Sequence, residues 1–281
     1  MTAASSAPVG VADLVPFAPT EGPFAGLDLI RLERAAGILH LRLNRAAKRN
    51  SVSDAMLRQI HTVFLNLSAD IRVVVMSGEG DHFSAGLDLS EVSERTVAEG
   101  IHHSRSWHAC FDAIQFGPVP VLAVLHGAVV GGGLELAAAA HLRVSETGTF
   151  YALPEGTRGI FVGGGGSVRI ARLMGTALMT DMMLTGRVLD AQEGLAARLA
   201  TYLVEPGAGL SKALELASRI AGNAPLSNYA ITQALPRIVE MGPSEGLFVE
   251  SLMSSIAQGD EAAKERVRAF LSKRAAKVER R

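Results

Sequence analysis

One stretch decides the fold: Val119-Pro-Val-Leu-Ala-Val-Leu-His-Gly-Ala-Val-Val-Gly-Gly-Gly-Leu-Glu-Leu-Ala137. An apolar run typical of a buried strand leads into glycines at 131–133 and then into a helix predicted over 133–140, with Glu135 in its first turn. Because these glycines carry no side chain, a ligand can approach the main chain there. The free N–H groups and the positive dipole end of the helix would stabilise an oxygen that becomes anionic. The stretch therefore predicts an anion-stabilising backbone site, with a plain glycine turn packed against a strand as the alternative.

Two other glycine motifs do not fit this stretch. A dinucleotide fingerprint counted from Gly131 would need Gly or Ala at position 136, where Leu136 stands. A phosphate-binding P-loop would continue into Gly-Lys-Ser or Gly-Lys-Thr, which follows neither glycine cluster of the chain. The sequence therefore predicts no nucleotide cofactor.

Outward from this stretch, strand and helix patterns alternate along the chain. Strands are predicted at 38–43, 73–76, 119–125 and 142–145, with a short extended piece at 149–153. Helices are predicted at 52–67, 101–116 and 133–140, and a glycine loop at 163–166 opens another. After 207 the pattern is helical only and ends in a helix at about 260–275. We therefore expect a flexible leader at 1–26, an α/β core at 27–205 and a helical C-terminal region at 206–281.

Composition narrows the class of protein. With 27 basic and 28 acidic residues the net charge is −1, so the whole chain lacks the positive field typical of nucleic-acid binding. No apolar run is long enough to span a membrane, and no secretory signal is visible. Cys110 is the single cysteine, which fits a reducing compartment. We expect a cytoplasmic protein with no nucleic-acid or membrane partner. We also expect no metal, since the histidines His102, His103 and His108 lack metal-ligand spacing.

Two further motifs carry chemistry only in combination. Phe83-Ser-Ala-Gly-Leu-Asp-Leu89 predicts a sharp turn whose amides could point into a cleft, with Asp88 as a cap for a following helix, and a simple turn is the alternative. Glu155 lies between Pro154 and Gly156 in an otherwise apolar stretch. It is either a capped loop residue or a catalytic acid whose pKa is shifted by burial.

Taken together, these motifs resemble the enoyl-CoA hydratase/isomerase family, also called the crotonase superfamily. The resemblance begins at about Leu27 and includes the Asn44–Asn50 loop and the Thr185-Gly186-Arg187 turn. It implies an α/β spiral of ββα repeats, with C-terminal helices that assemble a homotrimer or a hexamer. It also implies an acyl-CoA substrate and no separate cofactor, since coenzyme A is part of the substrate.

The resemblance also implies roles for particular residues. It makes Glu135 and Glu155 the catalytic acids, and it makes the N–H groups of Ala85 and Gly132 the oxyanion hole. The substrate-binding residues that it implies are Ala85, Gly86, Leu87, Asp88, Gly132 and Gly163.

The chemistry implied is addition of water across the α,β double bond of a short-chain enoyl-CoA. Two amides would stabilise the enolate oxygen, one carboxylate would deprotonate water, and the other acid would protonate Cα. We expect Glu135 to act mainly as the base and Glu155 as the proton donor, although the sequence does not fix that order. The alternatives are a Δ3,Δ2-enoyl-CoA isomerase, which needs one main acid/base, and a non-catalytic acyl-CoA-binding protein.

A narrower resemblance concerns the acyl group. The run 151–169, together with Trp107-His108 and 181–187, resembles methylthioacryloyl-CoA hydratases. We expect Phe161 and Trp107 to close the acyl pocket at short chain length. The basic end of the chain, 264–281, is either a solvated helix with a frayed tail or a contact for the phosphates of coenzyme A.

Overall fold

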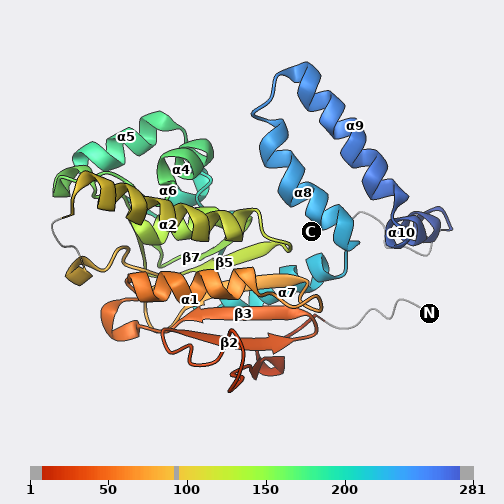
Figure 1. Cartoon of the computed structure of the whole chain (residues 1–281), viewed down its shortest axis with the longest axis horizontal. Helices are drawn as coiled ribbons and strands as arrows, with labels where there is room; N and C mark the ends of the chain where they lie inside the picture. Colours follow the sequence, from red (N-terminus) through yellow and green to blue (C-terminus); the bar gives the residue numbers. More distant parts are fainter. Residues whose placement is uncertain (1–7, 92–94, 273–281) are drawn as a thin grey trace.

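The computed structural model describes residues 8–91 and 95–272, and it shows a layered α/β body from which the last helices extend (Figure 1). The main sheet has seven strands in the order β1-β2-β3-β4-β5-β7-β10. Strand β2 pairs antiparallel with β1 and β3, and the strands from β3 to β10 run parallel. Their bounds are β1 Val15–Pro16, β2 Ile30–Ala35, β3 Ile38–Leu43, β4 Val73–Gly78, β5 Val121–Leu125, β7 Leu142–Glu146 and β10 Tyr202–Val204.

A second, three-stranded sheet contains β6 (Ala128–Val130), β8 (Phe150–Ala152) and β9 (Val188–Asp190). The chain runs from β5 through β6 into helix α3 (Gly132–Ala139), and then from β7 through β8 toward helix α4 (Gly166–Met174). Each of these two turns of the spiral thus adds one strand to the main sheet and one to the small sheet before its helix. The predicted ββα spiral is confirmed. Because Val130 pairs with Ala152, the loops that carry the glycine cluster and Glu155 leave the small sheet side by side.

The main sheet is covered on both faces. Alternate residues of β4 enter two apolar clusters: Val74 and Met76 face the larger one, and Val73 and Val75 face the one built with helix α7 (Gly209–Ala221). This explains why the predicted strand 73–76 is a continuous apolar run rather than an alternating one. The remaining helices of the core are α1 Asp54–Leu65, α2 Val97–Gln115, α5 Thr176–Thr185 and α6 Ala191–Ala196.

Local signals decide where α2 and one buried histidine lie. Helix α2 begins before the predicted 101–116, because Thr96 and Glu99 form a capping box.

At the far end of α2, the His141 ring accepts the Val121 N–H at Nδ1 (2.9 Å) and donates from Nε2 to the Gln115 carbonyl (3.0 Å). Burial lowers the pKa of His141 to about 4, so the ring is neutral in the folded protein at pH 7.

The C-terminal part is helical from α7 onward, as predicted. It continues with α8 (Pro225–Ile238), α9 (Pro243–Gly259) and α10 (Glu261–Leu271), and α8 and α9 stand away from the sheets (Figure 1). The predicted last helix, about 260–275, ends at Leu271 in the described part, and the basic residues after 272 lie outside it. No helix in the described ranges combines the length and the apolar character that crossing a membrane would require.

The prediction of a flexible leader at 1–26 is wrong for the residues that the structure describes. Strand β1 pairs with β2, and the Val9 N–H donates to Ser218 Oγ at 2.9 Å. Phe17 and Phe24 pack against the larger apolar cluster. The prolines hide this pairing from periodicity, because a two-residue edge strand leaves no alternating pattern. Residues 1–7 of the expected leader lie outside the described residues.

Candidate active site

A cavity of about 820 Å³ lies where the two glycine-rich loops meet α2. Its wall contains Glu135 from the first turn of α3 and Glu155 from the loop after β8. Helix α2 contributes Gly100, His103, Ser104 and Trp107 to the same wall. The two acids predicted from separate motifs are therefore brought to one cavity, which also includes Leu87, Gly132 and Gly163.

Two backbone amides in this wall are free. The N–H groups of Leu87 and Gly132 donate to no other residue within the described ranges. They lie close together, since a Cβ built on Gly132 would be 3.4 Å from the Leu87 nitrogen. The same Cβ would be 2.9 Å from Trp107 Cζ3, so position 132 has no room for a side chain. A paired set of free amides is the arrangement that stabilises an anionic oxygen.

The prediction that Ala85 supplies one of these N–H groups is wrong, because the Ala85 N–H donates to the Arg49 carbonyl at 2.9 Å. The cause is the parallel bridge between Val52 and Leu87. There the Val52 N–H donates to the Gly86 carbonyl (2.7 Å) and the Asp88 N–H to the Val52 carbonyl (3.0 Å). Successive amides of an extended segment point to opposite edges, so the Leu87 N–H is the one directed away from Val52.

Glu135 is held by the glycine loop that opens α4. Its Oε1 accepts the N–H groups of Gly164 (2.8 Å) and Gly166 (2.7 Å). The side chain is 4% exposed. Burial raises the pKa of Glu135, and these two hydrogen bonds oppose the rise because they stabilise the charged form.

Glu155 follows β8 and precedes the short 3₁₀ helix Gly156–Arg158. It is 6% exposed, and its Oε2 has no hydrogen-bond partner among the described residues. Burial, together with the nearby charge of Glu135, raises the pKa of Glu155 to about 7. A carboxyl group with this pKa exchanges a proton readily at neutral pH.

A clamp behind the glycine loop was not predicted from the sequence. Arg169 of α4 is buried, and it donates to the Gly164 carbonyl (3.1 Å), Gln115 Oε1 (2.7 Å) and Asp112 Oδ1 (2.5 Å). Ser104 Oγ donates to the Gly163 carbonyl at 2.6 Å. The loop that holds Glu135 is thus tied to α2 at two points. Arg169 stands three residues after a glycine run, but no spacing rule would single it out.

The other predicted substrate-binding residues differ in position. Gly163 lines the cavity, whereas Gly86 stands beside it with φ +94°, where a Cβ would be 2.6 Å from the Val130 carbonyl oxygen. The Asp88 carboxylate is occupied by Arg45 (2.8 Å) and Ser90 (2.7 Å), which hold its pKa at about 2. Asp88 thus caps the 3₁₀ helix Leu89–Glu91, as predicted, and its side chain does not face the cavity.

Trp107 and Phe161 both line the cavity, but they do so differently. Trp107 is buried beside Gly132, whereas Phe161 is 69% exposed. A side chain this exposed does not close a pocket, so the predicted closure by Phe161 is absent from the described structure.

Clusters of three or more His, Cys, Asp or Glu residues able to hold a metal are absent from the described ranges.

Comparisons with known proteins agree with this geometry. The profile of the family "Enoyl-CoA hydratase/isomerase" matches residues 33–281. The 2,3-dehydroadipyl-CoA hydratase of Escherichia coli K12 is 33% identical over 245 residues, which cover 86% of this chain and 95% of that protein. The short-chain-enoyl-CoA hydratase of Clostridium acetobutylicum is 28% identical over 251 residues, covering 88% and 96%.

Among solved structures, one from Rhodopseudomonas palustris CGA009 carries a provisional enoyl-CoA hydratase assignment. It is 54% identical, with a TM-score of 0.85 over 89% of this chain and 97% of that chain. The family profile covers the spiral, the two acids and the paired amides. The chain therefore belongs to the enoyl-CoA hydratase/isomerase family of enzymes.

Proposed function

We propose that this enzyme adds water across the α,β double bond of a short-chain enoyl-CoA. The observation that carries the proposal is the combination of two buried carboxyl groups with raised pKa values and two free amides in one cavity. Attack of water at Cβ moves negative charge onto the thioester oxygen. Losing one donor to such an oxygen typically costs on the order of 3–4 kcal/mol of barrier. We assign the two donors to Leu87 and Gly132.

The environments of the two acids suggest separate roles. Two amides stabilise the charged form of Glu135, so this residue suits the base that takes a proton from water. Glu155, with a pKa of about 7, retains a proton in a good part of the molecules at neutral pH and suits the donor to Cα.

Product mass tests the reaction. Crotonyl-CoA should gain the mass of one water, and its enoyl-thioester absorbance should disappear. Glu135→Gln and Glu155→Gln should each lower turnover roughly 10²–10⁴-fold, while Glu205→Gln, at an exposed position after β10, serves as the matched control. An isomerase would shift the double bond without a mass change, and a binding protein would leave the substrate intact. Either result would contradict hydration.

Methylthioacryloyl-CoA is our candidate among short acyl groups. Besides the sequence resemblance, the position of Trp107 against Gly132 supports a narrow site next to the thioester. Water added at Cβ of this substrate gives a hemithioacetal that can release methanethiol. Methanethiol should therefore appear together with consumption of the substrate. No reaction with it would remove this candidate and leave crotonyl-CoA hydration as the test of the general proposal.

We also propose a homotrimer, or a hexamer made from two trimers. Large apolar side chains are exposed on α8, on α9 and between them, and burial between subunits would remove them from water. They are Ile231, Leu235, Val239, Met241, Leu247, Phe248, Leu252 and Ile256. Light scattering should show a trimer or a hexamer at micromolar concentration, and Phe248→Asp should shift it toward monomer. A wild-type monomer would contradict this proposal.

Two expectations concern conditions of activity. Turnover should need no added metal or nicotinamide and should survive a chelator, because the proposed steps use only carboxyl groups and amides. We also propose a cytoplasmic location, because a chain with Cys110 as its single cysteine forms no internal disulfide, as is usual in a reducing compartment. Loss of activity with a chelator, restored by a metal ion, would contradict the first expectation.

A further inference from the structure

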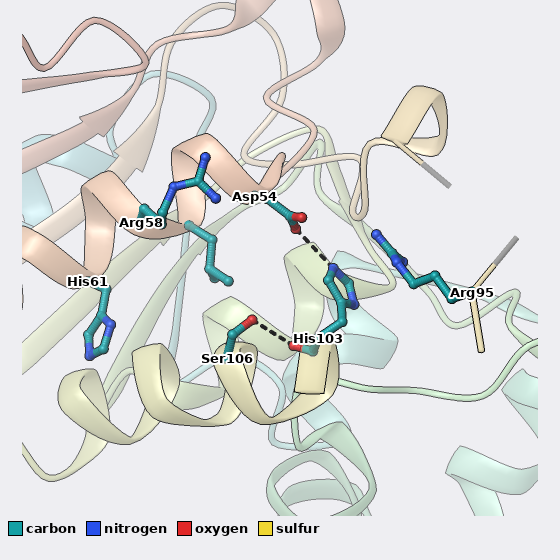
Figure 2. Close-up of a pocket in the computed structure, with 7 residues that line it drawn as sticks. Asp54, Arg58, His61, Arg95, His103 and Ser106 are labelled. Atoms are coloured by element: carbon teal, nitrogen blue, oxygen red, sulfur yellow. Dashed lines mark hydrogen bonds and ion pairs between the residues drawn. The ribbon is translucent and has the colours of Figure 1, made fainter. Parts of the chain in front are cut away.

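Two cavities outside the active site differ in how the charges of their walls are balanced. The first, of about 320 Å³, lies between α1 and α2, where Asp54 Oδ1 is 2.9 Å from His103 Nε2 (Figure 2). Its wall thus contains a carboxylate of its own. The second, of about 440 Å³, lies between α8 and the body of the fold, against β5, β7 and α4, and we call it the α8 cavity. Its described wall contains three arginines and neither aspartate nor glutamate.

Most residues in the wall of the α8 cavity are apolar. Leu173 of α4 and Ile220 of α7 are half-buried there. Ile231 and Leu235 of α8 are exposed and form the outer rim, which the cavity shares with the surface proposed for assembly. The volume lies within the range of about 300–1,000 Å³ that is usual for small-molecule sites. The shape and the wall therefore suit a ligand with an alkyl chain.

Arg143 of β7 is the most buried arginine in this wall, at 5% exposed. Its Nε donates to the Leu199 carbonyl (2.9 Å) and its Nη1 to the Ala140 carbonyl (2.7 Å). It forms no ion pair with any described carboxylate. Burial lowers the pKa of Arg143 to about 10, so the guanidinium is still cationic at pH 7. A buried cation without a counter-ion is costly, and an anionic ligand would remove that cost.

The third guanidinium nitrogen of Arg143, Nη2, is open to the α8 cavity. It donates to no described residue. Enclosed side-chain polar atoms without a partner are confined, among the described residues, to Trp107 and Glu155, so Arg143 Nη2 retains accessible surface. Of the cavities described, the α8 cavity is the one with Arg143 in its wall.

The other basic groups of the wall leave no comparable charge. Arg169 is paired with Asp112 at 2.5 Å, and Arg172 is paired with Glu240 at 2.6 Å. The His141 ring, with its pKa lowered to about 4 by burial, is neutral at pH 7. Within the described wall, Arg143 is therefore the cation whose charge is unmatched.

We propose that the α8 cavity binds a free alkyl carboxylic acid, with its carboxylate on Arg143 Nη2 and its chain along Leu173 and Ile220 toward the rim. Arginine is a strong donor to a carboxylate, and such charge-assisted bonds are stronger than neutral ones. The ligand is not the thioester substrate, so the inference does not depend on which acyl group the active site takes. The site adjoins the clamp behind Glu135, because Gln115 and Arg169 belong to both.

Octanoate and octanamide are matched probes for this site, because they share the alkyl chain and differ in the charge of the head group. Calorimetric titration uses the full chain saturated with butyryl-CoA, a thioester without a double bond to hydrate, so that the active-site cavity is occupied. One octanoate should bind per chain, with a Kd at least about tenfold lower than that of octanamide, as a charge-assisted hydrogen bond would give. Equal affinities, or no saturable binding of octanoate, would overturn the inference.

Variants locate the carboxylate. Arg143→Met should raise the Kd of octanoate about tenfold and leave that of octanamide unchanged, whereas Arg143→Lys should keep part of the preference. Arg105→Gln removes an exposed arginine outside the described wall and should change neither Kd. An unchanged preference in Arg143→Met, or an equal loss in Arg105→Gln, contradicts the inference. If Arg143→Met does not fold, the wild-type preference for octanoate still decides.

Light scattering on the same samples distinguishes the other possible occupant of the α8 cavity, a second copy of this chain. The size of the wild-type particle should stay the same when octanoate is added. If octanoate dissociates an assembly, the cavity is filled by the second copy, and the inference is wrong.

Discussion

Replacing Glu155 by glutamine should stabilise the fold while it lowers turnover roughly 10²–10⁴-fold. The pKa of Glu155 is raised from 4.5 to about 7 in the folded protein. Between these values the folded state binds a proton that the unfolded state has released. The resulting stability is fully present below pH 4.5 and is lost as the pH rises through 7. Above pH 7 the folded state must carry a buried charge, and glutamine removes this cost.

The magnitude follows from the two pKa values. At about 1.4 kcal/mol for each tenfold change in proton affinity, the interval from 4.5 to about 7 corresponds to at most about 3.5 kcal/mol. Because the cavity admits solvent, which screens the charge, we expect a gain of about 1–3 kcal/mol for Glu155→Gln above neutral pH. Near pH 4 both side chains are neutral, and the gain should vanish.

Thermal unfolding at fixed protein concentration measures this gain. At about pH 8.5 the Tm of Glu155→Gln should exceed that of the wild type by on the order of 2–4 °C per kcal/mol, and near pH 4 the two should agree. Glu205→Gln, exposed after β10, should show neither effect. The reasoning is refuted if Glu155→Gln is no more stable than the wild type at high pH, or if its gain is the same at both pH values.

Three other predictions concern the surroundings of the site. Gly132→Ala places a Cβ 2.9 Å from Trp107 Cζ3, so crotonyl-CoA turnover should fall about 100-fold. Adding Trp107→Leu to this variant should restore part of the turnover. If nothing is restored, the steric reasoning is wrong. Arg169→Lys keeps the charge but loses the planar guanidinium that ties the glycine loop to α2, so kcat/KM should fall roughly tenfold. Because this loop holds Glu135, the pH dependence of kcat/KM should also shift, which an unrelated packing defect would not produce. The depressed pKa of His141, about 4, gives stability that is present above pH 6.5 and lost as the pH falls toward 4. Urea unfolding at pH 6.5 and at pH 4 gives the loss of unfolding free energy between these two pH values. That loss should be smaller for His141→Asn than for the wild type, by up to about 3 kcal/mol.

The sequence predicts those parts of the fold and site that are written in local patterns. The apolar run and glycine cluster at 119–137 predict β5, the start of α3 and the place of Glu135 in its first turn. The local pattern singles out Glu155, an acid between Pro154 and Gly156 in an apolar segment, but it leaves a capped loop residue as the alternative, and the family resemblance implies the catalytic role. The structure places Glu155 on the same cavity as Glu135.

Features that depend on distant pairing were not predicted. The short strands β6, β9 and β10 have three residues each, too few for a period to be visible. Which amide of the 83–89 turn is free depends on Val52, more than thirty residues earlier, whose bridge to Leu87 directs the Asp88 N–H toward Val52 and the Leu87 N–H away from it. A motif gives the order of residues in such a turn, but only the partner strand decides which amide is left without an acceptor.

The buried polar atoms without partners point to the same cavity by an independent route. Within the described ranges, two buried side-chain polar atoms have no hydrogen-bond partner, Glu155 Oε2 and Trp107 Nε1, and both belong to residues of this wall. Leaving such a group unpaired costs about 1–3 kcal/mol. The other buried side-chain polar atoms in the described ranges have partners, so the cost is concentrated in this wall, where a reactive carboxyl group is needed. The free amides of Leu87 and Gly132 add two unsatisfied donors to the same wall. The unsatisfied groups thus include both donors and a proton-exchanging acid, which is the complement of a thioester that gains negative charge on its oxygen and a proton on carbon.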